Sequence, residues 1–154
     1  MKKTILTVLI SIVCFTAGAQ VFASMGYNNH GPEFQLGVID PGGVVEFKIA
    51  AKLSILPTNP WITSATIGHV LTLTNYEDET KNFHLIPSIG FAHYHYRTKP
   101  DDLNKQDPNE EKGWGFISGL EVNKDFAAGR LYVSANYAKS LYVGLGMKVF
   151  FSKL

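Results

Sequence analysis

The chain has 154 residues, and its 14 lysine and arginine residues nearly balance 13 aspartate and glutamate residues, giving a formal net charge of +1. This length suits one domain. The balanced charge argues against nucleic-acid binding, which favours a strongly basic surface. The single cysteine, Cys14, excludes an intramolecular disulfide and a cysteine-based metal site.

The N-terminus has the three parts of a secretion signal. Lys2 and Lys3 provide the charged region, residues 5–15 form a short apolar stretch, and residues 17–19 (Ala-Gly-Ala) form a small-residue cleavage site. We therefore expect residues 1–19 to be a signal peptide, so that Cys14 is removed when this segment is cleaved. The exported domain is then residues 20–154, with 12 basic and 13 acidic residues and a charge of −1.

The predicted elements are β-strands, because apolar and polar residues alternate with a period of two along most of the remaining chain. In chain order they cover residues 21–27, 33–38, 44–53, 61–74, 83–96, 114–124, 130–138 and 141–151. Pro87 interrupts the fifth strand and suggests a local bulge. The last strand is the most regular, with Leu141, Val143, Leu145, Met147, Val149 and Phe151 on one face.

Short connections alternate with longer ones along the chain. The short connections are residues 40–43, 76–82 and 125–129. The longer connections are residues 28–32, 54–60 and 98–112, and residues 139–140 also fall in this second set although they are very short. This pattern is typical of outer-membrane barrels, with short periplasmic turns and longer extracellular loops. Aromatic residues should form two belts at the membrane surfaces: Tyr27, Phe34, Trp61, Trp114 and Tyr137 outside, and Tyr76, Phe83, Phe126 and Phe151 on the periplasmic side.

Charge indicates which face of each strand meets lipid. The polar face carries Glu46, Lys48, Lys52, Glu121, Arg130 and Lys148, while the other face is nearly free of charge. We therefore expect an all-β, antiparallel, up-and-down transmembrane barrel of about eight strands, with a charge network filling a narrow lumen and no open pore. A soluble lipocalin-like barrel, with its apolar face inward around a ligand, is the alternative.

These dyad repeats, the loop parity and the terminal strand resemble the small eight-stranded outer-membrane proteins of Gram-negative bacteria, the OmpX and OmpA transmembrane-domain type. The junction at residues 17–20 is similar to that of exported Bacteroidetes proteins. The resemblance implies an outer-membrane location, contact with lipid and lipopolysaccharide, and recognition by the barrel-assembly machinery. It also implies a monomer.

Candidate chemistry is sparse in the sequence, and no cofactor is predicted. His93 and His95 share one strand face, and His69 is the third histidine with that orientation, so a metal site is a weak hypothesis. Lipid A deacylases are similar in size and architecture, but position 95 is histidine where such enzymes place serine, so no catalytic residue is assigned.

The loop at residues 98–112 holds Asp101, Asp102, Asp107, Glu110 and Glu111. We expect a non-enzymatic surface barrel whose extracellular loops bind an unknown partner; a barrel enzyme that modifies outer-membrane lipid is the alternative.

Overall fold

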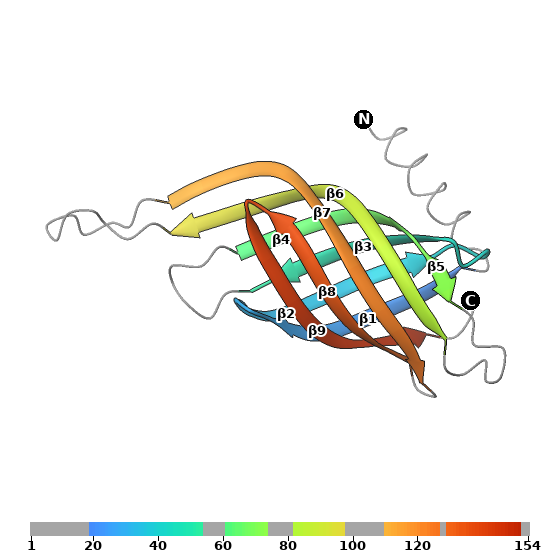
Figure 1. Cartoon of the computed structure of the whole chain (residues 1–154). Coiled ribbons are helices and arrows are strands. Elements are labelled where there is room, and N and C mark those ends of the chain that lie inside the picture. Colours follow the sequence, from blue (N-terminus) through green and yellow to red (C-terminus); the bar gives the residue numbers. More distant parts are fainter. Residues whose placement is uncertain (1–18, 54–60, 74–81, 98–109, 127–128, 152–154) are drawn as a thin grey trace, which may run out of the picture.

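The computed structural model describes residues 19–53, 61–73, 82–97, 110–126 and 129–151, and the elements in these ranges are all β-strands (Figure 1). They are β1 (Gln20–Asn28), β2 (Gly31–Ile39), β3 (Val45–Lys52), β4 (Trp61–His69), β5 (Leu71–Leu73), β6 (Phe83–Arg97), β7 (Glu110–Phe126), β8 (Gly129–Ala138) and β9 (Ser140–Phe151). In the described ranges, no helix is long and apolar enough to span a membrane.

The strands close into one antiparallel barrel. Their order is β4-β3-β2-β1-β9-β8-β7-β6-β5, and β4 also pairs with β6, which joins the two ends of the sheet. β4 and β5 both pair with β6 on either side of a short break at Val70, so they act as one wall strand. The wall of the barrel therefore consists of eight strands, which confirms the predicted fold class.

The break at Val70 lies opposite Ile86, next to Pro87. Gly68 pairs with Ser88 before the break and Leu71 pairs with Leu85 after it, so no extra residue enters either strand. The predicted bulge is therefore wrong. Proline has no backbone N–H to donate, so the ladder is interrupted here while the register continues.

The stagger of the barrel fixes the tilt of its strands. Following paired residues once around the wall from Phe151 leads back to β9 at Leu141, ten residues away. With ~3.3 Å per residue along a strand and ~4.8 Å between strands, eight strands and this stagger require a tilt of about 41°. This value agrees with the ~35–45° tilt of outer-membrane barrels.

The outer face of the wall is apolar and the inner face is polar. Large exposed side chains along the outside include Ile49 (67%), Leu145 (66%) and Phe116 (79%), whereas Glu46 and Lys148 inside are 1% and 0% exposed. A lipocalin-like barrel would have the opposite arrangement. The lipocalin alternative is therefore wrong.

The turn between β2 and β3 is tight, as predicted for residues 40–43. The Asp40 carboxylate accepts backbone N–H bonds from Gly42 (3.1 Å), Val44 (2.6 Å) and Val45 (2.6 Å). These bonds lower the pKa of Asp40, and the bond from Val45 has the largest effect. Gly43 has a φ of 72°, which glycine adopts without steric cost.

The connections at the opposite end of the barrel differ from prediction. β1 and β2 are joined by Asn29 and His30 alone, where residues 28–32 were expected to form a longer loop. Their hairpin is closed by the Asn28 side chain, which accepts N–H bonds from His30 (2.8 Å) and Gly31 (3.2 Å). β7 begins at Glu110, so Glu110 and Glu111, which were expected in a loop at residues 98–112, are strand residues.

Candidate functional site

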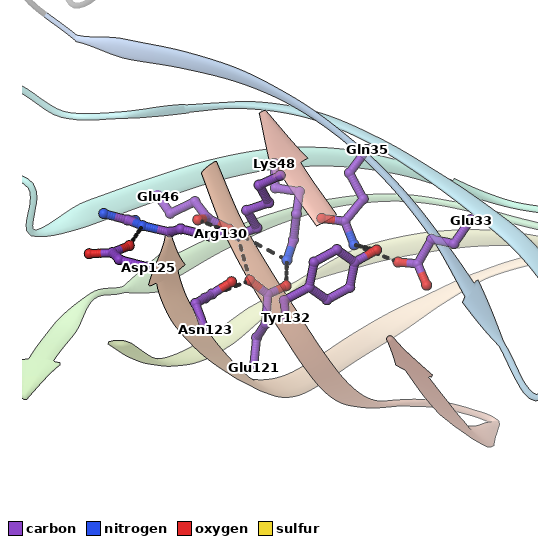
Figure 2. A network of polar contacts seen from close by, with 10 residues as sticks. Glu33, Gln35, Glu46, Lys48, Glu121, Asn123, Asp125, Arg130 and Tyr132 are labelled. Carbon is purple, nitrogen blue, oxygen red and sulfur yellow. Dashed lines mark hydrogen bonds and ion pairs between the residues drawn. The ribbon is translucent and has the colours of Figure 1, made fainter. Parts of the chain in front are cut away.

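Four charged side chains form a closed ring at the centre of the lumen. β3 contributes Glu46 and Lys48, β7 contributes Glu121, and β9 contributes Lys148. Lys48 Nζ lies 2.7 Å from Glu121 Oε2 and 3.5 Å from Glu46 Oε1. Lys148 Nζ lies 2.8 Å from Glu46 Oε2 and also contacts Glu121 Oε1. Each of the four carboxylate oxygens therefore faces an ammonium group (Figure 2). We call these four residues the charge ring.

A second ion pair lies toward the end of the barrel that holds the β1–β2 hairpin. Lys52 Nζ is 3.7 Å from Glu33 Oε1, which also accepts a 2.7 Å hydrogen bond from Gln35 Nε2. Lys52 Nζ further lies 5.1 Å from the ring centroid of Tyr142. Beyond this pair, a buried apolar cluster occupies the lumen, formed by Ile62, Ala92, Tyr94, Ile117, Ala138 and Tyr142.

A hydrogen-bonded series lies at the other mouth of the lumen. Asp125 accepts from Arg130 Nε on one oxygen (2.6 Å) and contacts His84 Nε2 with the other (2.8 Å), and His84 Nδ1 contacts Thr72 Oγ1 (2.9 Å). An ionised carboxylate only accepts hydrogen bonds. Opposite an ionised carboxylate, His84 carries a hydrogen on Nε2; the Thr72 hydroxyl donates to Nδ1 when the imidazole is neutral and accepts from it when the imidazole is protonated.

The lumen is electrically balanced. Its described acidic residues are Glu33, Glu46, Glu121 and Asp125, and its described basic residues are Lys48, Lys52, Lys148 and Arg130, four of each sign. Burial of so many charges is tolerable only when they are mutually paired.

The predicted lumen residues thus divide into three groups. Glu46, Lys48, Glu121 and Lys148 come together, but Lys52 pairs with Glu33 and Arg130 pairs with Asp125, so these two do not join the ring. The partners of Lys52 and Arg130, and His84, were not among the predicted site residues. Alternation placed Glu33 on the polar face but gave no sign of its partner, and Asp125 was assigned to a turn.

Aromatic rings and glycines fill the remaining lumen space. Phe22 is fully buried, with Lys148 Nζ 4.6 Å from its ring centroid and the Phe150 ring 5.8 Å away. Tyr132 lies over Gly26 and Gly146, where a Cβ on Gly146 would come within 2.6 Å of the tyrosine oxygen. Glycine is required on the inner face of β9 here because the tyrosine occupies the space of a side chain.

The three candidate metal-ligating histidines are not brought together. His93 pairs with Thr63 of β4, and His69 lies six residues further along that strand, about 20 Å away at ~3.3 Å per residue. His93 instead packs against Trp114, with 4.9 Å between ring centroids and 58° between the ring planes. The described residues hold no group of three His, Cys, Asp or Glu side chains able to bind a metal ion. Alternation showed that these histidines share a face but not that they lie at different levels.

The predicted aromatic belts occupy two levels of the outer face. Tyr27, Phe34, Trp61, Trp114 and Tyr137 are exposed near one end, and Phe83 and Phe151 near the other, while Phe126 is half-buried. Tyr76, Asp101, Asp102 and Asp107 lie outside the described residues.

One hairpin projects past its neighbours on the side of β8. β6 and β7 are paired from Phe83–Lys124 to Arg97–Glu110, but β7 pairs with β8 only from Ser118 onward. Residues 110–117, about 26 Å of strand at ~3.3 Å per residue, therefore have no β8 partner among the described residues. We call this segment the β7 edge; Figure 1 shows the hairpin extending past the other strands.

Comparisons with known proteins give the fold. No protein-family model matches the chain, and no curated protein matches it significantly. Among solved structures, the N-terminal β-barrel domain of OprF from Pseudomonas aeruginosa aligns with a TM-score of 0.57 at 12% identity, over 86% of this chain and 96% of that one. A de novo designed transmembrane β-barrel aligns with a TM-score of 0.51 at 11% identity, over 88% of this chain and 96% of that one. The chain therefore has the fold of the small eight-stranded outer-membrane β-barrels, which confirms the predicted resemblance.

Proposed function

We propose that the protein is a non-enzymatic outer-membrane surface barrel that binds an extended polypeptide through its projecting β6–β7 hairpin. The membrane location is supported by the apolar outer face and by the fold. The lumen contains paired charges and aromatic rings among the described residues, which argues against a transport function. The observation that carries the proposal is the β7 edge, because β7 has no β8 partner there among the described residues and an extended polypeptide can add to a sheet at such a place.

Sequence around the hairpin supports a surface role. Residues 98–112, between the apolar parts of the two strands, contain five acidic residues and three lysines. So polar and charged a segment suits contact with a partner in water. Binding by strand addition would draw affinity from the backbone of the β7 edge and specificity from side chains beside it.

Two truncations of the hairpin test the proposal and separate the edge from the tip. In the first, residues 98–109 are replaced by Asn-Gly, which joins the paired Arg97 and Glu110 by a tight turn. In the second, residues 93–114 are replaced in the same way, joining Ala92 to Gly115 and removing most of the edge. Both retain the pairing of β6 with β7 below Ala92, so the barrel should still form.

The probe is a phage-displayed library of random peptides, selected on the purified barrel in detergent. We expect selected peptides to bind the first truncation as they bind the full chain, and to slow amide hydrogen exchange in the β7 edge. The second truncation should lose binding. If no peptide protects these amides, or if the second truncation binds equally well, the proposal is wrong. Loss of binding in the first truncation would place recognition in the tip and also contradict it.

A second candidate function is favoured by the series Thr72–His84–Asp125. When the imidazole is neutral, a hydroxyl donates to a histidine that a carboxylate orients, which is the arrangement of a nucleophile, a general base and the group that orients the base. It would suit hydrolysis of an acyl ester at the periplasmic mouth. Arg130 competes for the same carboxylate, which favours a purely structural role.

Hydrolysis of p-nitrophenyl butyrate by the purified barrel decides this second candidate. Thr72→Ala and His84→Gln should abolish turnover and Thr72→Ser should retain it, with Thr63→Ala on the outer face of β4 as a matched control. Turnover that is absent, or unaffected by Thr72→Ala, would exclude the hydrolase.

A further inference from the structure

The backbone groups of β7 alternate in direction, and one hydrogen bond shows which residues face the β7 edge. The N–H of Asp125 donates to the carbonyl oxygen of Asn82, the residue before β6, at 3.0 Å. In an antiparallel ladder, the N–H and C=O of one residue point to the same side, and those of the next residue point to the other. The pairing of β7 with β6 continues residue by residue up to Glu110. Odd-numbered residues of β7 therefore face β6, while the backbone groups of Trp114 face the β7 edge.

The carbonyl of Trp114 accepts a hydrogen bond from inside the lumen. The Tyr94 hydroxyl of β6 donates to this oxygen at 2.7 Å. Tyr94 pairs with Gly113, so its side chain crosses the inner face of β7 to reach an atom that points away from β6. An added strand would use the same oxygen, because the backbone carbonyls along a sheet edge are the acceptors for its N–H groups.

Two glycines provide the space that Tyr94 occupies. A Cβ on Gly113 would lie 2.9 Å from Tyr94 Cε2, and a Cβ on Gly115 would collide with the tyrosine hydroxyl. Tyr94 is 4% exposed and belongs to the apolar cluster, and Lys139 Nζ lies 4.5 Å from its ring centroid. The ring is therefore held in place, and its hydroxyl is fixed beside Gly115 on the inner side of the β7 edge.

The position of this hydroxyl makes the β7 edge selective. An added strand places the side chain opposite Gly115 on the same inner side, with about 5 Å between Cβ positions, so that side chain can reach the Tyr94 hydroxyl. If it is apolar, the hydroxyl keeps its bond to Trp114 and the incoming N–H competes for one oxygen. A carboxylate, which only accepts hydrogen bonds, instead takes the hydroxyl hydrogen and leaves the Trp114 oxygen to the incoming strand.

We propose that the polypeptide bound at the β7 edge carries an aspartate or glutamate opposite Gly115, whose carboxylate accepts the hydrogen bond of Tyr94. Tyr94 thereby determines specificity, while the backbone of β7 supplies the ladder bonds. A bond from a hydroxyl to a carboxylate is charge-assisted and stronger than the bond to the carbonyl that it replaces. This inference rests on the proposed function, because it specifies the partner of the same edge.

The test compares three forms of the full chain in detergent: the unmodified protein, Tyr94→Phe, and Tyr132→Phe as the matched control. Tyr94→Phe removes the hydroxyl and keeps the ring in the apolar cluster. Tyr132→Phe removes a lumen hydroxyl that accepts from Gln35 Nε2 (3.4 Å) and lies beside Asn123, outside the β7 edge. A phage-displayed library of random peptides is selected on each form, and heat-modifiable gel mobility shows that each barrel has formed.

We expect peptides selected on the unmodified chain and on Tyr132→Phe to share an acidic residue at one position, and peptides selected on Tyr94→Phe to lack it. Replacing that acidic residue by alanine should weaken binding to the unmodified chain about tenfold, equivalent to ~1.4 kcal/mol, the order of a hydrogen bond to a charged group. The same replacement should leave binding to Tyr94→Phe unchanged, because the two changes remove one interaction.

Two outcomes would overturn the inference. Peptides without a shared acidic residue on the unmodified chain, or an equal loss of binding on Tyr94→Phe, would show that Tyr94 does not select the partner. Protection of the β7 edge from hydrogen exchange by such peptides would leave the strand-addition function in place. Absence of any bound peptide on all three forms would instead contradict the proposed function itself, and this inference with it.

Discussion

Lys148 Nζ of β9 lies 2.8 Å from Glu46 Oε2 of β3, although the two residues are 102 positions apart and β1 and β2 separate their strands in the sheet. The contact crosses the lumen and depends on the closed wall. Because Glu121 and Lys48 complete the ring, removal of any one member leaves an uncompensated buried charge.

Substitution of Lys148 by methionine should destabilise the barrel. Glu46 and Glu121 would each lose a partner, and the loss of one member of a buried ion pair costs about 3–5 kcal/mol. Urea unfolding in lipid vesicles, followed by tryptophan fluorescence, measures the change. The double variant Glu46→Gln, Lys148→Met should lose less stability than the sum of the two single variants. Strict additivity would show that the pair does not interact.

The unmodified protein should not conduct ions. The charge ring and the apolar cluster around Tyr94 both lie across the lumen. Planar lipid bilayers containing the purified barrel should show no discrete steps above background. Steps at neutral pH in the unmodified chain would mean that the lumen is not filled.

Asp40→Ala should weaken the β2–β3 turn in a pH-dependent way. The pKa of Asp40 is lowered in the folded protein, chiefly by the N–H of Val45. A lowered pKa contributes stability that is present above the unfolded value and is lost as pH falls through the folded value. We therefore expect a loss of about 0.5–1.5 kcal/mol at pH 7 that disappears near pH 2. Thermal unfolding at several pH values checks this, with Asp40→Asn as the uncharged isostere. A difference that grows on acidification would have the wrong sign.

Gly146→Ala should cost stability through crowding in the lumen. A Cβ here would lie 2.6 Å from the Tyr132 oxygen, the Gly26 Cα and the Met25 carbonyl oxygen, and overpacking typically costs ~1–3 kcal/mol. Tyr132→Phe in the same chain should recover part of the loss, because it removes one of these three contacts. Leu145→Ile, on the adjacent lipid-facing position, is the control. Unchanged unfolding in Gly146→Ala would mean that Tyr132 moves aside freely.

Alternation along the chain was sufficient to predict the strands and the side of the wall that each residue faces, because a period of two is a local property. It placed Glu46, Lys48, Glu121 and Lys148 on the polar face. It could not give their partners, which depend on a stagger of ten residues accumulated around the whole barrel. Likewise, His69 and His93 lie on the same face of the wall but at different heights along the barrel. The early start of β7 at Glu110 was missed because pairing with β6 defines it and its first residues lack alternation.

The charge ring also bears on the order in which the barrel is assembled. Glu46, Lys48 and Glu121 belong to β3 and β7, while Lys148 belongs to β9, whose pairing with β1 closes the seam between the chain's first and last strands. A barrel that lacks β9 therefore has two carboxylates and one ammonium at its centre. Charge balance at the centre of the lumen therefore requires β9, and an unpaired carboxylate there would be costly in lipid.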